Sequence, residues 1–184
     1  MNDQAIIKKS KWLSKHLRHQ PERIGLTLEP GGWVKVSDLL AAAKRFNMGL
    51  SQSQLEEVVA GNDKQRFAFD ETGTKIRANQ GHSVEVDLEL EPETPPPFLF
   101  HGTGAQNREL LLREGLKKMR RHHVHLSADL GTAIKVGSRH GKPLVFTVDA
   151  ALMSAEGHIF YRSANGVWLT DEVPPSYLEI DSDS

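Results

Sequence analysis

A stretch rich in arginine and histidine, RRHHVHLSAD from Arg120 to Asp129, carries the side chains best suited to chemistry. If it forms a β-strand, alternation places four polar side chains on one face: Arg121, His123, His125 and Ser127. Two imidazoles at this spacing could share a metal ion, but the guanidinium beside them would repel a dication. An anion fits better, because guanidinium offers a fork of donors and imidazole adds a donor with a transferable proton. The third alternative is a strand face exposed to water.

Three more cationic clusters precede this stretch in the chain. LRHQP places Arg18 and His19 at the end of a predicted helix, where cations are also favoured by the helix dipole. NDKQRF places Arg66 next to two alternating phenylalanines, and IRANQGHS contains a further polar set: Arg77, Gln80, His82 and Ser83. Taken singly, each cluster is better explained by a solvated helix end or hairpin face than by a site.

Two glycine-containing turns complete the candidate chemistry. FHGTG ends a predicted strand at His101–Gly104, and its glycines allow backbone N–H groups to approach a ligand closely. SANGVWLT supplies an Asn-Gly turn before Val167 and Trp168, which a plain hairpin with a core tryptophan also explains. The chain contains neither GxGxxG nor GxxxxGK[ST], so the Rossmann and P-loop motifs are both excluded.

Composition narrows the class of protein. The 184 residues include no cysteine, which excludes disulfides and thiolate metal sites. No run of about 18 apolar residues predicts a membrane span, and the first residues lack the apolar core of a signal peptide. We therefore expect a cytoplasmic protein with no membrane partner.

Charge is unevenly distributed although the net charge is only −1. Residues 1–79 carry 13 Lys+Arg against 9 Asp+Glu, residues 80–97 carry five acids and no base, and residues 98–184 carry 10 of each. The mildly basic N-terminal part permits a phosphate-bearing partner without demanding one.

An acidic, proline-rich stretch, VDLELEPETPPPF, marks the clearest boundary. Three consecutive prolines cannot continue a helix or a central strand, and they stiffen a spacer. We predict a domain over residues 1–87, a linker over 88–97 and a second domain over 98–184.

The first domain is predicted to contain three helices and then a hairpin. Ser10 and Ser37 are the expected caps of the first two helices, while Ser51 and Gly61 bound the third. QRFAFDETGTKIRA alternates around a glycine turn and predicts the hairpin. Three helices followed by a hairpin is a winged-helix layout, which often binds nucleic acid, although fold alone does not establish function.

The second domain is richer in predicted strands. FLFHGT, HVHLSAD, PLVFTVDA and the two arms of IFYRSANGVWLT indicate strands, and NRELLLREGL and LGTAIKVGSRHG indicate helices, the first closed by Gly115. The fold class is therefore α+β, and the second domain has a largely β core.

Eight motifs taken together are far more specific than any one of them. SKWLSKHLRHQPERIGL, GGWVKVSDLL, NDKQRF, IRANQGHS, FHGTG, RHHVHLSAD, VGSRHGKP and NGVWLT occur in this order, from about Ser10 to Leu178. In this arrangement the chain closely resembles the RNA 2′-phosphotransferase family, NAD-dependent enzymes that remove an internal 2′-phosphate from RNA.

The resemblance implies an N-terminal winged-helix lobe that binds RNA and a C-terminal ADP-ribosyltransferase-like lobe that binds NAD. It also implies a two-step reaction in which NAD is consumed as a co-substrate. The RNA 2′-phosphate displaces nicotinamide to give an ADP-ribosylated RNA 2′-phosphate intermediate, and the neighbouring ribose 2″-hydroxyl then attacks phosphorus. The products are RNA with a free 2′-OH, ADP-ribose 1″,2″-cyclic phosphate and nicotinamide, and no metal is required.

The family's catalytic set, carried over by motif, consists of Arg18, His19, Arg66 and Arg121. Because the first three precede the linker and the fourth follows it, the resemblance predicts a site between the lobes. The residues expected to bind NAD are His101, Gly102, Thr103, His125, Ser127, Arg139, Asn165 and Val167. Val167 occupies a position that is acidic in many protein-modifying relatives, which fits a nucleophile that is already anionic. His19 is our candidate for the general acid toward the departing RNA 2′-oxygen.

Two other functions remain open at this point. An ADP-ribosyltransferase acting on terminal phosphates of RNA or DNA would use the same motifs and leave a stable ADP-ribosylated product. A winged-helix module without catalysis would release no nicotinamide. We expect a monomer whose partners are NAD and an RNA with an internal 2′-phosphate. That RNA would be tRNA in organisms whose tRNA splicing leaves such a phosphate.

Overall fold

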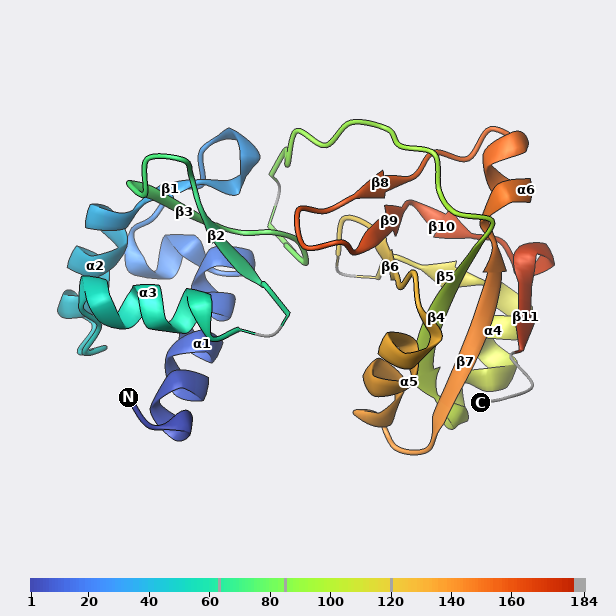
Figure 1. Cartoon of the computed structure of the whole chain (residues 1–184), viewed down its shortest axis with the longest axis horizontal. Coiled ribbons are helices and arrows are strands. Elements are labelled where there is room, and N and C mark those ends of the chain that lie inside the picture. Colours follow the sequence, from blue (N-terminus) through green and yellow to red (C-terminus); the bar gives the residue numbers. More distant parts are fainter. Residues whose placement is uncertain (63, 85, 120, 181–184) are drawn as a thin grey trace. The chain divides into compact units, whose positions relative to one another are not determined.

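The chain folds into two compact units, which are described separately here. The computed structural model describes residues 1–62, 64–84, 86–119 and 121–180, so Arg120 of the cationic stretch lies outside the described residues. Unit 1 comprises Met1–Glu89 and unit 2 comprises Leu90–Ser184 (Figure 1). Among the described helices, none combines the length and apolar character that crossing a membrane requires.

Unit 1 places three α-helices before most of its strands. Its helices are α1 (Asp3–Arg18), η1 (Pro21–Ile24), η2 (Pro30–Gly32), α2 (Val36–Arg45) and α3 (Gln52–Ala60). Its strands are β1 (Val34–Lys35), β2 (Phe67–Phe69) and β3 (Lys75–Ala78). The strands form one antiparallel sheet in the order β1-β3-β2.

The first helix begins earlier than the sequence predicted. Its N-cap is Asn2, whose side chain accepts a hydrogen bond from the Ala5 backbone N–H, so the prediction that Ser10 caps this helix was wrong. Residues 3–9 are mostly polar or exposed, and an apolar stripe therefore marks only the later turns. Pro21 ends the helix, because the residue before a proline is disfavoured in the α conformation.

The caps of the other two helices had mixed outcomes. Ser37 lies inside α2, whose N-cap is Lys35 without a side-chain bond, so the predicted Ser37 cap was wrong. Ser51 and Gly61 bound α3 as predicted, and Ser51 with Gln54 forms a capping box. The predicted hairpin is also confirmed as β2 paired with β3, with Phe67 opposite Ala78.

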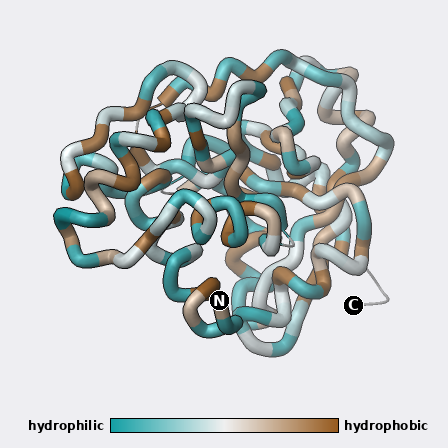
Figure 2. Tube along the Cα trace, turned by 60° about the vertical axis from the view of Figure 1, so that its left-hand side comes forward, coloured by the Kyte–Doolittle hydropathy of each residue, from teal (hydrophilic) through white to brown (hydrophobic). Residues whose placement is uncertain are grey.

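The unit 1 core lies between the helices and this small sheet. Its fully buried side chains come from all three helices and from β3, and include Leu13, Leu17, Leu39, Leu55 and Ile76. Along the trace, brown apolar residues alternate with teal hydrophilic ones, as the amphipathic helices require (Figure 2).

Unit 2 contains the longer strands. Its strands are β4 (Phe98–Gly104), β5 (Leu116–Lys117), β6 (Val124–Leu126), β7 (Pro143–Asp149), β8 (Tyr161–Arg162), β9 (Trp168–Thr170), β10 (Glu172–Val173) and β11 (Leu178–Ile180). Its helices are η3 (Ala105–Asn107), α4 (Arg108–Glu114), α5 (Leu130–Ser138), α6 (Ala150–Ala155) and η4 (Pro175–Tyr177).

Three antiparallel sheets build unit 2, in the orders β11-β7-β4, β6-β9-β8 and β10-β5. A bridge between Phe100 and Ser127 joins the first two, with backbone hydrogen bonds of 2.9 and 2.8 Å in the two directions. This bridge connects β4 to the cationic stretch. His101–Gly104 continue β4 and pair with β7, so the prediction that the strand ends in a glycine turn here was wrong. The apolar core is formed mainly by β4, β7 and β9 and includes Leu99, Phe146 and Trp168.

The predicted strand HVHLSAD is shorter than expected. Only Val124–Leu126 is extended as β6, whereas Arg121–His123 form bends, so the idea of one continuous polar strand face was wrong. Other local predictions are confirmed. Gly115 closes α4, and β8 pairs with β9 around the Asn165-Gly166 turn.

The acidic, proline-rich segment is held against unit 2. The Glu93 backbone N–H donates to the Phe160 carbonyl at 2.8 Å, and the Glu93 carboxylate pairs with Arg162 at 2.8 Å. The Pro97 carbonyl accepts a 3.0 Å bond from Ala151. These contacts fix residues 93–97 to the rest of unit 2.

Candidate active site

The end of α1 carries the first two predicted residues. Arg18 is the last residue of the helix and His19 is its C-cap, which donates its backbone N–H to the Lys15 carbonyl at 3.2 Å. His19 is exposed and Arg18 is half-buried, so both side chains are available at the surface of unit 1.

A return segment, residues 79–83, runs from the end of β3 back to this helix end. The Ser83 backbone N–H donates to the Arg18 carbonyl at 2.9 Å, and the Ser83 Oγ lies 2.8 Å from His19 Nδ1. Gly81 adopts a positive φ of 86°, and a Cβ there would lie 3.3 Å from Arg18 Cζ. The return segment therefore orients both Arg18 and His19.

The same segment holds the loop that carries Arg66. The Asn79 backbone N–H donates to the Arg66 carbonyl at 2.9 Å, and its amide Nδ2 donates to the Gln65 carbonyl at 2.6 Å. The Arg66 side chain makes no hydrogen bond or ion pair with the described residues. The three predicted residues of unit 1 are thus attached to one short piece of backbone, and this arrangement could bind an anion.

In unit 2, Arg121 and the two predicted histidines are connected by hydrogen bonds. Arg121 Nη1 lies 3.0 Å from His125 Nδ1, and because a guanidinium can only donate, His125 Nδ1 must accept. A neutral His125 therefore carries its proton on Nε2. Loss of solvent contact lowers the pKa of Arg121, which nevertheless stays charged at neutral pH.

His101 has the opposite tautomer. Its Nδ1 lies 3.2 Å from the His125 carbonyl oxygen, which can only accept, so Nδ1 carries the proton. Burial lowers the pKa of His101, which keeps the ring neutral and its Nε2 an acceptor. One imidazole thus offers an acceptor nitrogen and the other a protonated one, a pairing suited to hydroxyl groups.

Gly102 and Thr103 are fixed by packing. A Cβ on Gly102 would lie 1.7 Å from the Ala133 carbonyl oxygen, so only glycine lets β4 lie this close to α5. Thr103 is buried, and its Oγ1 accepts a hydrogen bond from Asn107 Nδ2 at 3.0 Å. Its neighbour across the helix contact is Gly137, whose Cβ would lie 2.8 Å from the Thr103 carbonyl.

The β8–β9 turn carries Asn165 and Val167. Ser163 organises this turn: its hydroxyl bonds to the Asn165 side-chain oxygen and accepts from the Val167 N–H at 3.1 Å. Val167 directly precedes Trp168, which pairs with Leu126 of β6. Asn165 and Val167 therefore lie at the end of the β6–β9 pair at which Ser127 follows β6.

Two predicted positions stand apart from this hydrogen-bonded group. Arg139 is exposed at the C-terminal end of α5, and no described side-chain contact joins it to the histidines. His123 packs its ring against Tyr161 with centroids 5.5 Å apart, and burial lowers its pKa. Within the described ranges, no three His, Cys, Asp or Glu side chains cluster as metal ligands.

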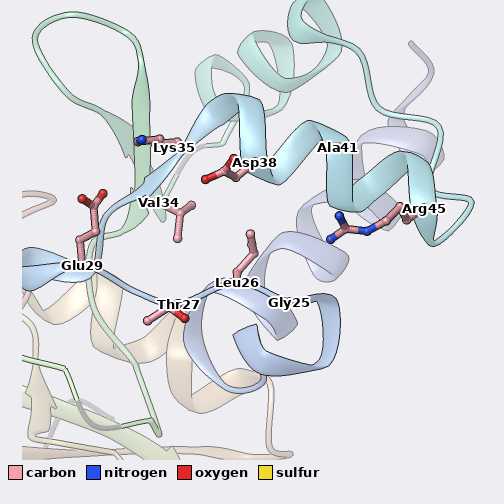
Figure 3. A pocket seen from close by; sticks show the side chains of 9 residues that line it. All are labelled: Gly25, Leu26, Thr27, Glu29, Val34, Lys35, Asp38, Ala41 and Arg45. Carbon is pink, nitrogen blue, oxygen red and sulfur yellow. The ribbon is translucent and has the colours of Figure 1, made fainter.

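A separate pocket of about 480 Å³ lies in unit 1, and none of the predicted residues lines it (Figure 3). Its charges are mixed, because Glu29 and Asp38 oppose Lys35 and Arg45. Arg45 is also committed to the fold through a 3.1 Å bond to the Ile24 carbonyl. This pocket is therefore a poorer anion site than the surface formed by the helix end and the return segment.

Sequence reasoning named Ser83 in a polar cluster but missed Asn79, Gly81 and the contacts by which these residues position the site. Ser83, Gly81 and Asn79 lie within IRANQGHS, but nothing local indicates that they contact the end of α1 or the Arg66 loop. Sequence reasoning also missed the packing role of Gly102, whose missing side chain makes room for α5. The available signal was the polar, glycine-containing sequence after β3, which is typical of a loop that bonds to other parts of the fold.

Comparison with known proteins agrees with the order of the motifs. The family model described as "RNA 2'-phosphotransferase, Tpt1 / KptA family" matches residues 4–172. The chain belongs to the Tpt1 / KptA family of RNA 2′-phosphotransferases. The match extends through both units, and every predicted site residue of this Tpt1 / KptA chain falls within it.

Relatives in this family are similar over nearly their whole length. The chain is 61% identical over 180 residues to a "Probable RNA 2'-phosphotransferase" of Trichormus variabilis, covering 98% of this chain and 99% of the relative. Identity to similarly named proteins is 54% in Herpetosiphon aurantiacus, covering 98% and 100% of the two chains, and 56% in Streptomyces coelicolor, covering 97% of each.

Proposed function

We propose that this protein is an RNA 2′-phosphotransferase that transfers an internal RNA 2′-phosphate to NAD. The observation that carries the proposal is the attachment of Arg18, His19 and Arg66 to one return segment, together with family membership. Two guanidinium groups and an imidazole, with no acidic residue among them, suit a dianionic phosphate.

We also propose that unit 1 is a winged-helix lobe that binds RNA and that unit 2 is an ADP-ribosyltransferase-like lobe. The three helices and antiparallel sheet of unit 1 support the first assignment. The three antiparallel sheets and the His101-Gly102-Thr103 strand end support the second. In this scheme both sets of residues act on the same reaction, with Arg121 contributed by unit 2.

NAD supplies an electrophilic ribose carbon with nicotinamide as leaving group, and a 2″-hydroxyl that accepts the phosphorus in the second step. The residues of unit 2 fit this molecule. His101 Nε2 can accept a hydrogen bond from a ribose hydroxyl and His125 Nε2–H can donate one, so the pair matches a diol. Ser127, Asn165 and Val167, at the β6–β9 end, and Arg139, at the C-terminal end of α5, complete our proposed NAD set.

The chain's own residues would act mainly by electrostatics. Arg18, Arg66 and Arg121 hold the phosphate and stabilise the charge that grows on its oxygens as phosphorus is attacked. His19 delivers a proton to the departing RNA 2′-oxygen, and its contact with Ser83 fixes the ring for that task. The substrate supplies the nucleophile, so no serine or cysteine nucleophile is needed.

The test is a short RNA with one internal 2′-phosphate, incubated with and without NAD. We expect dephosphorylation and nicotinamide release only with NAD, at a rate that excess chelator does not change. Arg66→Ala should lower the rate about 10²–10³-fold, the usual cost of one such donor, with an unchanged melting temperature. Dephosphorylation without NAD, or full activity in the variant, would contradict the proposal.

A second candidate activity is ADP-ribosylation of terminal phosphates on RNA or DNA, which the same anion site could support. Product analysis separates the two: cyclic phosphate release indicates the transfer reaction, and a stable ADP-ribosylated end indicates the alternative. We further propose a cytoplasmic monomer, and tRNA as the substrate wherever splicing leaves a 2′-phosphate.

A further inference from the structure

One face of α1 carries three lysines in line with His19. At about 100° per residue, Lys8, Lys11, Lys15 and His19 fall within a sector of about 80° on the helix surface. We call Lys8, Lys11 and Lys15 the lysine stripe. All three lysines are exposed, and the stripe ends at the helix terminus that carries the candidate phosphate site.

The lysine stripe has no ion-pair partner among the residues that the structure describes. The only acidic residue of α1 is Asp3, in its first turn. Lys9, by contrast, lies off the stripe and its ammonium group donates to the Gly49 carbonyl. The three stripe lysines therefore differ from their neighbour in being left to solvent.

An ordinary solvated helix face mixes both signs of charge. Here Lys8 and Lys11 are three residues apart and Lys11 and Lys15 are four apart, spacings at which like charges destabilise a helix. No carboxylate in the same sector offsets this repulsion. A polyanion lying along the helix would offset it, and a nucleic-acid backbone is a polyanion of suitable length.

We propose that the lysine stripe binds the phosphodiester backbone of the RNA strand whose 2′-phosphate is held at Arg18 and His19. This inference rests on the proposed function and adds the path of the substrate. With a rise of 1.5 Å per residue, Lys15, Lys11 and Lys8 lie about 6, 12 and 16 Å along the axis from His19. The flanking nucleotides on one side of the modified one would follow this line.

The first experiment compares two variants with equal loss of charge in unit 1. Lys11→Gln with Lys15→Gln removes two stripe lysines, and Lys35→Gln with Lys44→Gln removes two exposed lysines elsewhere. For a ten-nucleotide RNA we expect the stripe variant to raise KM about tenfold with little change in kcat. The slope of log KM against log salt should fall by about 1.4, or 0.7 per lost phosphate contact on a single strand.

The second experiment uses RNAs lengthened one nucleotide at a time from the modified nucleotide, in either direction. Lys15→Gln should begin to matter with the shortest extension, Lys11→Gln with a longer one and Lys8→Gln with the longest. This order should occur for extensions on one side only, because one strand lies along one helix. A 2′-phosphorylated dinucleotide should be turned over by all three variants within twofold of the unmodified protein.

Equal KM values for the stripe and control variants on the long RNA would overturn the proposal. So would an equal loss with the dinucleotide, because the lysines would then act at the phosphate site and not along the strand. If the dinucleotide is not turned over at all, the proposed function fails. Fluorescence anisotropy of the long RNA without NAD would still decide whether the stripe binds it. Circular dichroism of each variant checks that α1 remains folded.

Discussion

The two units hold their candidate residues in different ways. In unit 1, Arg18, His19 and Arg66 are attached through hydrogen bonds of the return segment, residues 79–83. In unit 2, the His101-Gly102-Thr103 segment of β4 lies in direct contact with the backbone of α5. The side-chain hydrogen bonds of Ser83 and Asn79 can be removed one at a time, whereas the close β4–α5 backbone contact leaves no room for a side chain.

This difference predicts different results of mutation. Substitutions around the unit 1 set should alter rate and pH dependence while the protein stays folded. Substitutions at the β4–α5 contact should lower stability first, because close-packed backbone cannot move to admit new atoms. Each experiment below tests one side of this comparison.

The largest effect is expected for Gly102→Ala. Its Cβ would lie 1.7 Å from the Ala133 carbonyl oxygen and 2.6 Å from its carbon, so α5 must move away from β4. We expect the free energy of unfolding to fall by about 3 kcal/mol or more, at the upper end of overpacking costs. Urea unfolding measures this loss. It is followed by tryptophan fluorescence in a background where Trp12 and Trp33 of unit 1 are replaced by Phe, so that only Trp168 of unit 2 reports.

Gly131→Ala in α5, the helix that packs on Gly102, is the matched control. The nearest atom to its Cβ would be Asp129 Oδ1 at 3.4 Å, an ordinary contact. Alanine also has the higher helix propensity, so stability should stay the same or rise by up to about 1 kcal/mol. If both variants lose stability equally, glycine at position 102 is not required for packing and the comparison fails.

A medium effect is expected for Ser83→Ala. The Ser83 backbone N–H continues to bond to Arg18, so the variant removes only the hydroxyl that lies 2.8 Å from His19 Nδ1. Loss of one hydrogen bond of about 1 kcal/mol predicts an approximately fivefold lower kcat and a shifted alkaline limb of the pH–rate profile, because a general acid must be protonated to act. Thermal stability should barely change.

Ser83→Thr keeps the hydroxyl and should restore both the rate and the pH profile. A Ser83→Ala protein with a normal profile would mean that Ser83 does not position His19. A large fall in melting temperature would mean that the Ser83–His19 contact stabilises the fold, like the β4–α5 contact of unit 2.

The smallest effect concerns His16, a buried residue of α1. Its Nδ1 donates to the Trp12 carbonyl at 2.8 Å, and burial lowers its pKa below the ordinary value of 6.5. The unfolded chain therefore binds this proton more readily than the folded one. Stability present above about pH 6.5 should be lost as the pH falls below it.

Amide hydrogen exchange in α1, measured at about pH 7.5 and 5.5, reports this loss for unit 1 alone. His16→Phe keeps a ring against Trp12, whose centroid lies 4.6 Å away, but cannot take up a proton. The acid-induced loss should shrink in the variant. An unchanged loss would mean that another group destabilises unit 1 in acid.

Local structure could be predicted wherever local chemistry decided it. The β2–β3 hairpin follows from alternation around the Gly73 turn, and α3 follows from Ser51 and Gly61. The start of α1 could not be predicted in this way, because its first turns carry no apolar stripe. The strand at Arg121–His123 failed because only Val124 and Leu126 are buried and fix an extended register.

The candidate site followed the same rule. Residue types indicated an anion site at several places, and a resemblance covering the whole chain selected among them. The return of residues 79–83 to α1 and the packing of Gly102 on α5 are contacts between distant parts of the sequence. Periodicity and turn chemistry describe neighbours along the chain, so neither contact could be predicted from them.

The backbone just before Arg66 has a consequence for substrate affinity. Gln65 has a φ of 45°, a left-handed conformation that a residue with a side chain seldom adopts, and Asn79 bonds to the carbonyls of Gln65 and Arg66. The backbone of Gln65 and Arg66 is therefore held by the fold before the substrate arrives. Because this backbone is already ordered, substrate binding does not include the entropy loss of ordering it. RNA binding should accordingly not be slowed by closure of the backbone around Arg66.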